Sequence, residues 1–88
     1  MRELVITSRF KRDYKKRSRE NVDVLLEPVL HLLIEGKALP AKFRDHALKG
    51  NYAHCRECHL KPDLLLIYIQ TETEVRLMRL GSHSELFA

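Results

Sequence analysis

The feature that most constrains this chain is a run of six apolar or aromatic side chains from Leu64 to Ile69. Successive side chains of a β-strand point to opposite faces, so a run that is apolar on both faces predicts a strand covered on both sides. We therefore expect a central strand at residues 64–70. At 88 residues the chain has room for one core, and we expect a single domain over residues 1–88.

The rest of the chain supplies short elements around that strand. Three further strands are predicted, at residues 4–7, 53–59 and 75–80. Ser8 is placed to cap a first helix that runs to about Ser18, and Asn21 to cap a second helix that ends at Gly36. Pro28 predicts a kink or a late start in the second helix. The expected fold is α+β in the order β-α-α-β-β-β, with two N-terminal helices packed on one face of a small, largely antiparallel sheet.

Positive charge is concentrated at the start of the chain. The 16 Lys and Arg against 12 Asp and Glu give a net charge of +4, and residues 1–20 hold half of the cations. Such a segment is either a solvated surface or a binding surface for a polyanion, and we take Lys15 and Lys16 as candidate contacts to RNA phosphates. The chain has no apolar run of about 18 residues and no signal-peptide pattern at its start, so we expect a cytoplasmic protein.

Five side chains in the second half supply the residue types that metal-free cleavage of RNA requires: His46, His59, Asp63, Arg79 and His83. Internal cleavage uses the 2′-hydroxyl of the RNA as nucleophile, so the enzyme must remove one proton, deliver another to the departing 5′-oxygen and stabilise charge at phosphorus. Histidine suits both proton transfers near neutral pH, and arginine suits the charge. We exclude His31, which falls opposite the apolar stripe of its helix with no other functional group beside it.

A competing motif, C-x-x-C-H at residues 55–59, fits covalent haem attachment. That chemistry belongs with export, and the motif here lies in a predicted strand, so we exclude haem. Zinc is excluded as well, because a strand points Cys55 and His59 to one face and His54 and Cys58 to the other. We expect both cysteines to be small buried residues, and we expect no cofactor and no metal.

Four segments stand in order along the chain: residues 43–50 (FRDHALKG), 56–59 (RECH), 62–68 (PDLLLIY) and 79–87 (RLGSHSELF). With this order and spacing the chain resembles the YafQ-type branch of the RelE toxins over essentially its whole length. The resemblance implies the small RelE-like microbial ribonuclease fold. It also implies a ribosome-dependent endoribonuclease, the toxin of a type II toxin–antitoxin system, that cuts translated mRNA in the ribosomal A site. The family's active-site positions correspond to His46, His59, Asp63, Arg79, His83 and Phe87.

Chemistry suggests a role for each of these residues. His83, just past the last strand, is expected to be the general acid. Either His59 or His46 is expected to be the base, with Asp63 orienting the base and raising its pKa. Arg79 is expected to bind the scissile phosphate through two parallel hydrogen bonds.

Aromatic and basic residues around these groups are candidates for RNA contact. Phe87 is expected to stack on a nucleobase. The expected basic surface comprises Arg44, Lys49 and Arg56, together with Lys15 and Lys16. The resemblance implies two kinds of partner, mRNA on the ribosome and an acidic, partly disordered antitoxin that covers the active site. The alternative is a non-catalytic protein of the same fold that inhibits its target by binding.

Overall fold

The structure, a computed structural model, describes residues 1–87. The elements follow in the order β1 (Glu3–Ile6), α1 (Ser8–Lys16), α2 (Val22–Glu35), η1 (Ala41–Phe43), β2 (His46–Ala47), η2 (Gly50–Tyr52), β3 (Arg56–Lys61), β4 (Leu64–Gln70), β5 (Glu74–Gly81) and α3 (His83–Phe87). The expected α+β fold and element order are confirmed. The structure adds a two-residue strand, two 3-10 turns and a short C-terminal helix.

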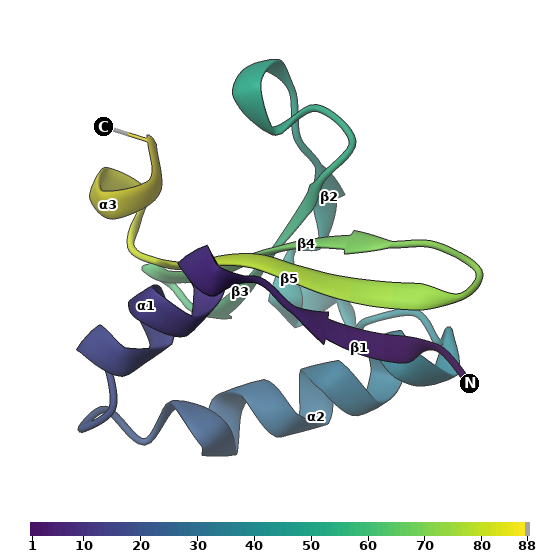
Figure 1. The fold of residues 1–88 in the computed structure, drawn as a ribbon, viewed down its shortest axis with the longest axis horizontal. Coiled ribbons are helices and arrows are strands. Elements are labelled where there is room, and N and C mark those ends of the chain that lie inside the picture. Colours follow the sequence, from purple (N-terminus) through teal and green to yellow (C-terminus); the bar gives the residue numbers. More distant parts are fainter. Residues whose placement is uncertain (88) are drawn as a thin grey trace.

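The five strands form one sheet in the order β1-β5-β4-β3-β2 (Figure 1). Only β1 pairs in parallel, with β5, while the other pairings are antiparallel. β4 lies in the middle, and its residues from Leu64 to Tyr68 are each at most 2% exposed. The prediction of a central strand covered on both faces is therefore confirmed.

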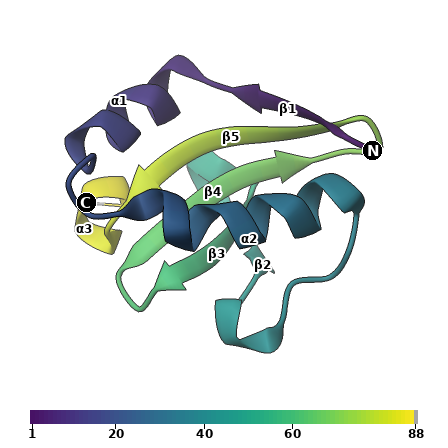
Figure 2. The same cartoon turned by 90° about the horizontal axis from the view of Figure 1, so that it is seen from below.

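Helices α1 and α2 cover one face of the sheet, and α2 runs along it (Figure 2). Val22, Leu26, Val29 and Leu33 recur on one side of α2 at helical spacing and are buried in the main core. Each such side chain stabilises the fold by roughly 1.5–3 kcal/mol when it is buried. Within residues 1–87 no helix is both long and apolar enough to cross a membrane.

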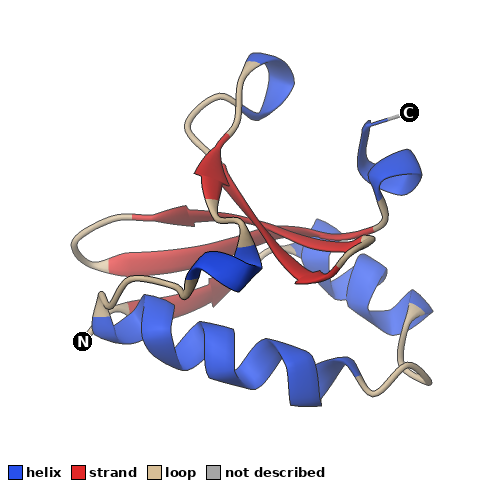
Figure 3. Cartoon of the chain, turned by 180° about the vertical axis from the view of Figure 1, so that it is seen from behind, coloured by secondary structure: helices blue, strands red, loops and turns tan. Residues whose placement is uncertain are grey.

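The opposite face of the sheet carries a smaller core, the η2 turn and α3 (Figure 3). Leu65 and Ile67 of β4 point to this side, where they join Cys55 and Leu86 in a second buried cluster. The η2 loop and α3 rise on this side of the red strands, away from α1 and α2 (Figure 3). The η2 turn and α3 therefore lie on the same side of the sheet as this second cluster (Figure 3).

Local details correct three expectations. Thr7, not Ser8, caps α1, because its Oγ1 accepts the Phe10 N–H at 3.2 Å. Asn21 stands at the N-cap of α2, but it adopts a left-handed conformation and its side chain makes no capping bond. The helix starts at Val22, so a late start at Pro28 is wrong.

The strand expected at residues 53–59 is shifted. It begins at Arg56 and extends to Lys61, because the η2 turn precedes it and His54 has a positive φ of 78° that interrupts extended backbone. His59 consequently lies inside β3 rather than at its end. α1 likewise ends at Lys16, two residues before the expected Ser18.

Candidate active site

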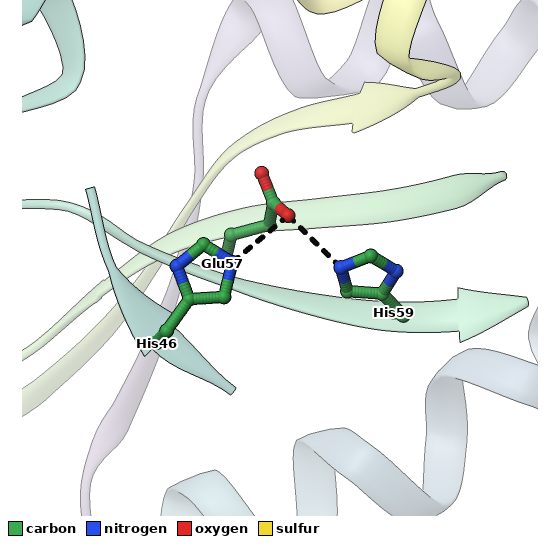
Figure 4. Close-up of side chains that lie close together, drawn as sticks. All are labelled: His46, Glu57 and His59. Carbon is green, nitrogen blue, oxygen red and sulfur yellow. Dashed lines mark hydrogen bonds and ion pairs between the residues drawn. The ribbon is translucent and has the colours of Figure 1, made fainter. Parts of the chain in front are cut away.

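A carboxylate between two imidazoles forms one end of the candidate site. Glu57 of β3 pairs in register with His46 of β2, and His59 lies two residues along β3 on the same face. Glu57 Oε1 lies 3.2 Å from His46 Nε2 and 3.0 Å from His59 Nε2 (Figure 4). The carboxylate is nearly buried, with 5% of its side chain exposed, so it requires these donors.

The contacts assign the donors on each ring. An ionised carboxylate only accepts, so both Nε2 atoms donate to Glu57. His46 Nδ1 also lies 3.2 Å from the Ala47 carbonyl. His59 Nδ1 is buried and has no hydrogen-bond partner among the described residues. A neutral His59 that donates from Nε2 to Glu57 carries its lone pair on Nδ1.

A second carboxylate–imidazole pair lies beside the first. Asp63, in the turn between β3 and β4, accepts the backbone N–H of His83 at 2.9 Å and lies 2.7 Å from His83 Nδ1. These hydrogen bonds, that of the backbone first, hold the pKa of Asp63 below its ordinary value. We expected Asp63 to orient His59 or His46, but the structure pairs it with His83.

The three histidine rings lie in a row. The His59 ring centroid is 6.4 Å from that of His46 and 5.7 Å from that of His83. His83 is half exposed, and its Nε2 remains available because Asp63 is paired with Nδ1. The accessible Nε2 of His83 thus lies on the ring next to His59, whose Nδ1 has no partner among the described residues.

Aromatic residues extend the row beyond His83. Phe87 lies one turn along α3, with its ring centroid 6.5 Å from His83, and 45% of the residue is exposed. Tyr52 of η2 meets Phe87 edge to face at 5.6 Å. The exposure of Phe87 is compatible with the expected stacking on a base.

Arg79 does not touch the histidines through any contact within residues 1–87. Its Nε and Nη2 donate to the two oxygens of Asp13 at 2.7 and 3.1 Å, and its Nη1 donates to the Tyr52 hydroxyl at 3.3 Å. Asp13 of α1 also accepts the Leu80 N–H at 3.0 Å. Arg79 is thus held in a largely buried ion pair. A chain of contacts through Tyr52 and Phe87 connects it to the row of histidine rings.

The other expected RNA contacts are distributed over the surface. Arg56 pairs with Asp45 at 2.9 Å, and Asp45 also accepts the hydroxyl of buried Tyr68, so this arginine has a structural partner. Arg44 and Lys49 are exposed in the loops on either side of β2. Lys15 and Lys16 are exposed but line different hollows on α1.

The residues of the C-x-x-C-H motif do not converge. Cys58 and His59 point to opposite faces of β3, and Cys55 precedes that strand. Cys58 is buried in the core under the helices and Cys55 in the core on the other face, and both are free thiols. Burial raises the pKa of Cys58 to about 12. One group of residues does suit a metal, since the ligating atoms of His46, Glu57 and His59 all lie within 4.8 Å of one another. Two imidazoles and a carboxylate form a donor set that suits zinc or copper.

Glu57 and Tyr52 were not among the residues expected from the sequence. Glu57 stands two residues before His59, so alternation along a strand would have placed both on one face. For Tyr52 no comparable signal exists, because it joins the site through the irregular η2 turn.

Comparison with known proteins shows the family of the chain. Residues 2–88 match the family model described as the bacterial toxin of a type II toxin–antitoxin system, YafQ. The chain belongs to the YafQ family. The toxin described as mRNA interferase toxin YafQ in Escherichia coli K12 is 33% identical over 88 residues, which covers 98% of this chain and 96% of that protein.

Solved structures of this family share the fold. A copper-bound mutant toxin from Helicobacter pylori is 42% identical with a TM-score of 0.91, covering 99% of this chain and 100% of that one. The structure of the E. coli DinJ–YafQ complex is 32% identical with a TM-score of 0.88, and both chains are covered in full. The expected α+β fold thus matches that of the solved YafQ structures.

Proposed function

We propose that this protein is an endoribonuclease, the toxin of a type II toxin–antitoxin system, that acts in the cytoplasm on mRNA held in the ribosomal A site. The observation that carries the proposal is the pairing of Asp63 with His83 Nδ1 directly beside the His59 ring. It supplies an oriented acid next to a candidate base, which is what 2′-hydroxyl attack on the adjacent phosphate requires. The family membership and the name of the E. coli relative support the same activity.

In this mechanism the 2′-hydroxyl proton passes to Nδ1 of His59, which is buried in the free protein and must become accessible when RNA binds, and Glu57, paired with Nε2, stabilises the imidazolium that forms. His59 is favoured over His46 as the base because the His59 ring lies beside that of His83. Among the described residues, no ring contact links His46 with His83. The 2′-oxygen then bonds to phosphorus, and the bond to the 5′-oxygen breaks. His83, protonated on Nε2, gives that proton to the departing oxygen, leaving a 2′,3′-cyclic phosphate and a 5′-hydroxyl.

The proposal is tested with ribosomes programmed with a defined mRNA, on which 3′ ends are mapped after wild-type protein or His83→Ala is added. We expect the variant to cleave roughly 10²- to 10⁴-fold more slowly, the range for loss of a general acid. His31→Ala is the matched control, because His31 is exposed on α2, and it should cleave at the wild-type rate.

Two results would contradict the proposal. Equal rates of cleavage by wild type and His83→Ala would show that His83 is not the general acid. Growth arrest in cells without new mRNA ends would instead favour a non-catalytic inhibitor of the same fold. Cleavage of the free mRNA as fast as the ribosome-bound one would refute only the dependence on the ribosome.

Partners follow from the same family. The E. coli relative is seen in complex with DinJ, and we propose that this chain is likewise neutralised by an antitoxin protein. Because the chain carries a net charge of +4, an acidic segment that folds over the histidine row is the expected inhibitor. Co-expression of its antitoxin should abolish cleavage.

The three residues that fit a metal lead to a second proposal, that this site binds copper, the metal present in a structure of a mutant toxin from H. pylori. Bound metal would polarise nearby oxygen atoms and would occupy imidazole lone pairs. Metal held by His46, Glu57 and His59 would take His59 and its carboxylate out of the proton chemistry proposed here, so Cu²⁺ should inhibit cleavage and a chelator should leave cleavage intact. Loss of activity with chelator would refute the metal-independent mechanism.

A further inference from the structure

The basic residues of α1 are divided between two flanks. Lys11 and Lys15 border an apolar groove between α1 and α2. Arg9, Arg12 and Lys16 recur at i, i+3 and i+7, so they share another stripe of the helix. This second stripe lines a separate hollow of about 230 Å³ together with Asp13 and Arg79.

The hollow is strongly positive. Four cations against one carboxylate leave a net charge of +3 at its lining. Asp13 does not cancel the rest, because its oxygens already accept from Arg79 and from the Leu80 N–H. Arg9, Arg12 and Lys16 form no ion pair within residues 1–87. Three cations that have no ion-pair partner among the described residues therefore surround this hollow.

Arg79 is fixed in an orientation that suits an anion. A guanidinium has five N–H donors, and Arg79 spends two on Asp13 and one on Tyr52. The two remaining donors, one on each Nη atom, have no partner among residues 1–87 and can donate to a phosphate. The ion pair with Asp13 thus positions Arg79 and leaves two of its donors unused.

We propose that this hollow binds a phosphodiester group of an RNA strand, one outside the point of cleavage. The proposal rests on the proposed function, and it assigns Arg79 to a neighbouring phosphate rather than to the scissile one. The path to the chemistry runs from Arg79 through Tyr52 and Phe87 to His83. A strand held by its backbone in the hollow can lay a base on Phe87 and present the next linkage to the histidines.

The test compares two double variants in the His83→Ala background, so that RNA stays intact. Arg9→Gln with Arg12→Gln removes two cations from the hollow. Lys11→Gln with Arg19→Gln removes the same charge from residues outside it. Binding is measured against salt concentration with a labelled single-stranded RNA dodecamer and with programmed ribosomes.

Loss of one phosphate contact makes the slope of log affinity against log salt shallower by about 0.7 on a single strand and about 0.9 on a duplex. We expect this change for the Arg9 and Arg12 variant only. A change with both probes supports a phosphate of the message, and a change with ribosomes alone supports a phosphate of ribosomal RNA. Equal slopes for the two variants overturn the proposal.

Cleavage kinetics separate this inference from the proposed function. With His83 intact, the Arg9 and Arg12 variant should raise KM severalfold at unchanged kcat, because it removes binding shared by ground and transition states. If the wild-type protein cleaves no RNA, the proposed function fails, and the binding slopes still decide the phosphate site.

Discussion

The helix that carries His83 is held by one glutamate, and we predict that this glutamate controls turnover. Glu85 Oε1 accepts the Ser82 N–H at 2.8 Å, and Ser82 Oγ accepts the Glu85 N–H at 3.2 Å, a reciprocal capping box. The same Glu85 oxygen pairs with Arg17, at the end of α1. The Ser82 N–H first, and then Arg17, lower the pKa of Glu85 to about 2.

The expected effect of Glu85→Ala combines two losses. A missing cap costs about 0.5–2 kcal/mol, and a half-exposed ion pair contributes roughly 0.2–1 kcal/mol. α3 has five residues, too few to be stable alone, and only Leu86 among them is buried. We therefore expect docking of α3 to lose about 1.5 kcal/mol, which lowers its docking equilibrium constant about tenfold. Because so short a helix is only marginally docked, kcat should fall by up to about tenfold.

The assay is single-turnover cleavage on programmed ribosomes at pH 7, with thermal unfolding measured in parallel. Glu85→Gln keeps an acceptor for Ser82 but loses the charge, so it and Arg17→Gln should each fall only about threefold, the size of an exposed ion pair. Glu72→Ala, an exposed glutamate in the β4–β5 turn, is the control. A Glu85→Ala variant with kcat within twofold of wild type would refute the reasoning. Because the pKa of Glu85 is lowered, its contribution is complete above its ordinary value of 4.5 and is lost only as the pH falls towards about 2.

Other predictions concern the two buried or paired aspartates and the histidine row. Asp63→Asn should lower kcat about 10- to 100-fold with little change in KM, because His83 loses the carboxylate that stabilises its charged form; an unchanged pH–rate profile would contradict this. The lowered pKa of Asp63 means that this support is present at neutral pH and is lost on acidification below its ordinary value of 3.8. Asp13→Asn should destabilise the fold by about 3 kcal/mol, since it leaves Arg79 without its partner; circular dichroism should show a melting temperature at least about 10 °C lower. Glu57→Gln should lower kcat and weaken Cu²⁺ binding in titration calorimetry, whereas loss of only one of these would separate the two roles.

The sequence predicted the sheet because its signal there was strong. The run from Leu64 to Ile69 has no polar face, and burial on both sides follows wherever such a strand is placed. The helices were predicted from apolar spacing, and the position of Asn21 before α2 was predicted as well, but the residue that caps α1 was not. Thr7 and Ser8 both carry a hydroxyl, and only the actual backbone decides which one reaches the Phe10 N–H.

The sequence indicated the candidate site residues better than it indicated which of them are hydrogen-bonded to each other. Asp63 is four residues from His59, and this short separation suggested a contact. Instead the turn after β3 directs Asp63 towards His83, twenty residues away. The start of α3 does have a signal in the sequence, since Ser82 and Glu85 stand at the spacing of a capping box.

The two carboxylate–imidazole pairs differ in environment, and the difference assigns the direction of proton flow. Asp63 and His83 are both about half exposed or more, so a departing RNA oxygen can reach the ring. Glu57 is 5% exposed and His59 is 13% exposed, so a positive charge gained on His59 is held next to a carboxylate with little screening by water. Groups whose surroundings differ in this way suit opposite roles in acid–base catalysis. The accessible pair therefore suits the acid and the enclosed pair the base, and exchanging the carboxylates by Glu57→Asp with Asp63→Glu should impair cleavage even though the net charge is unchanged.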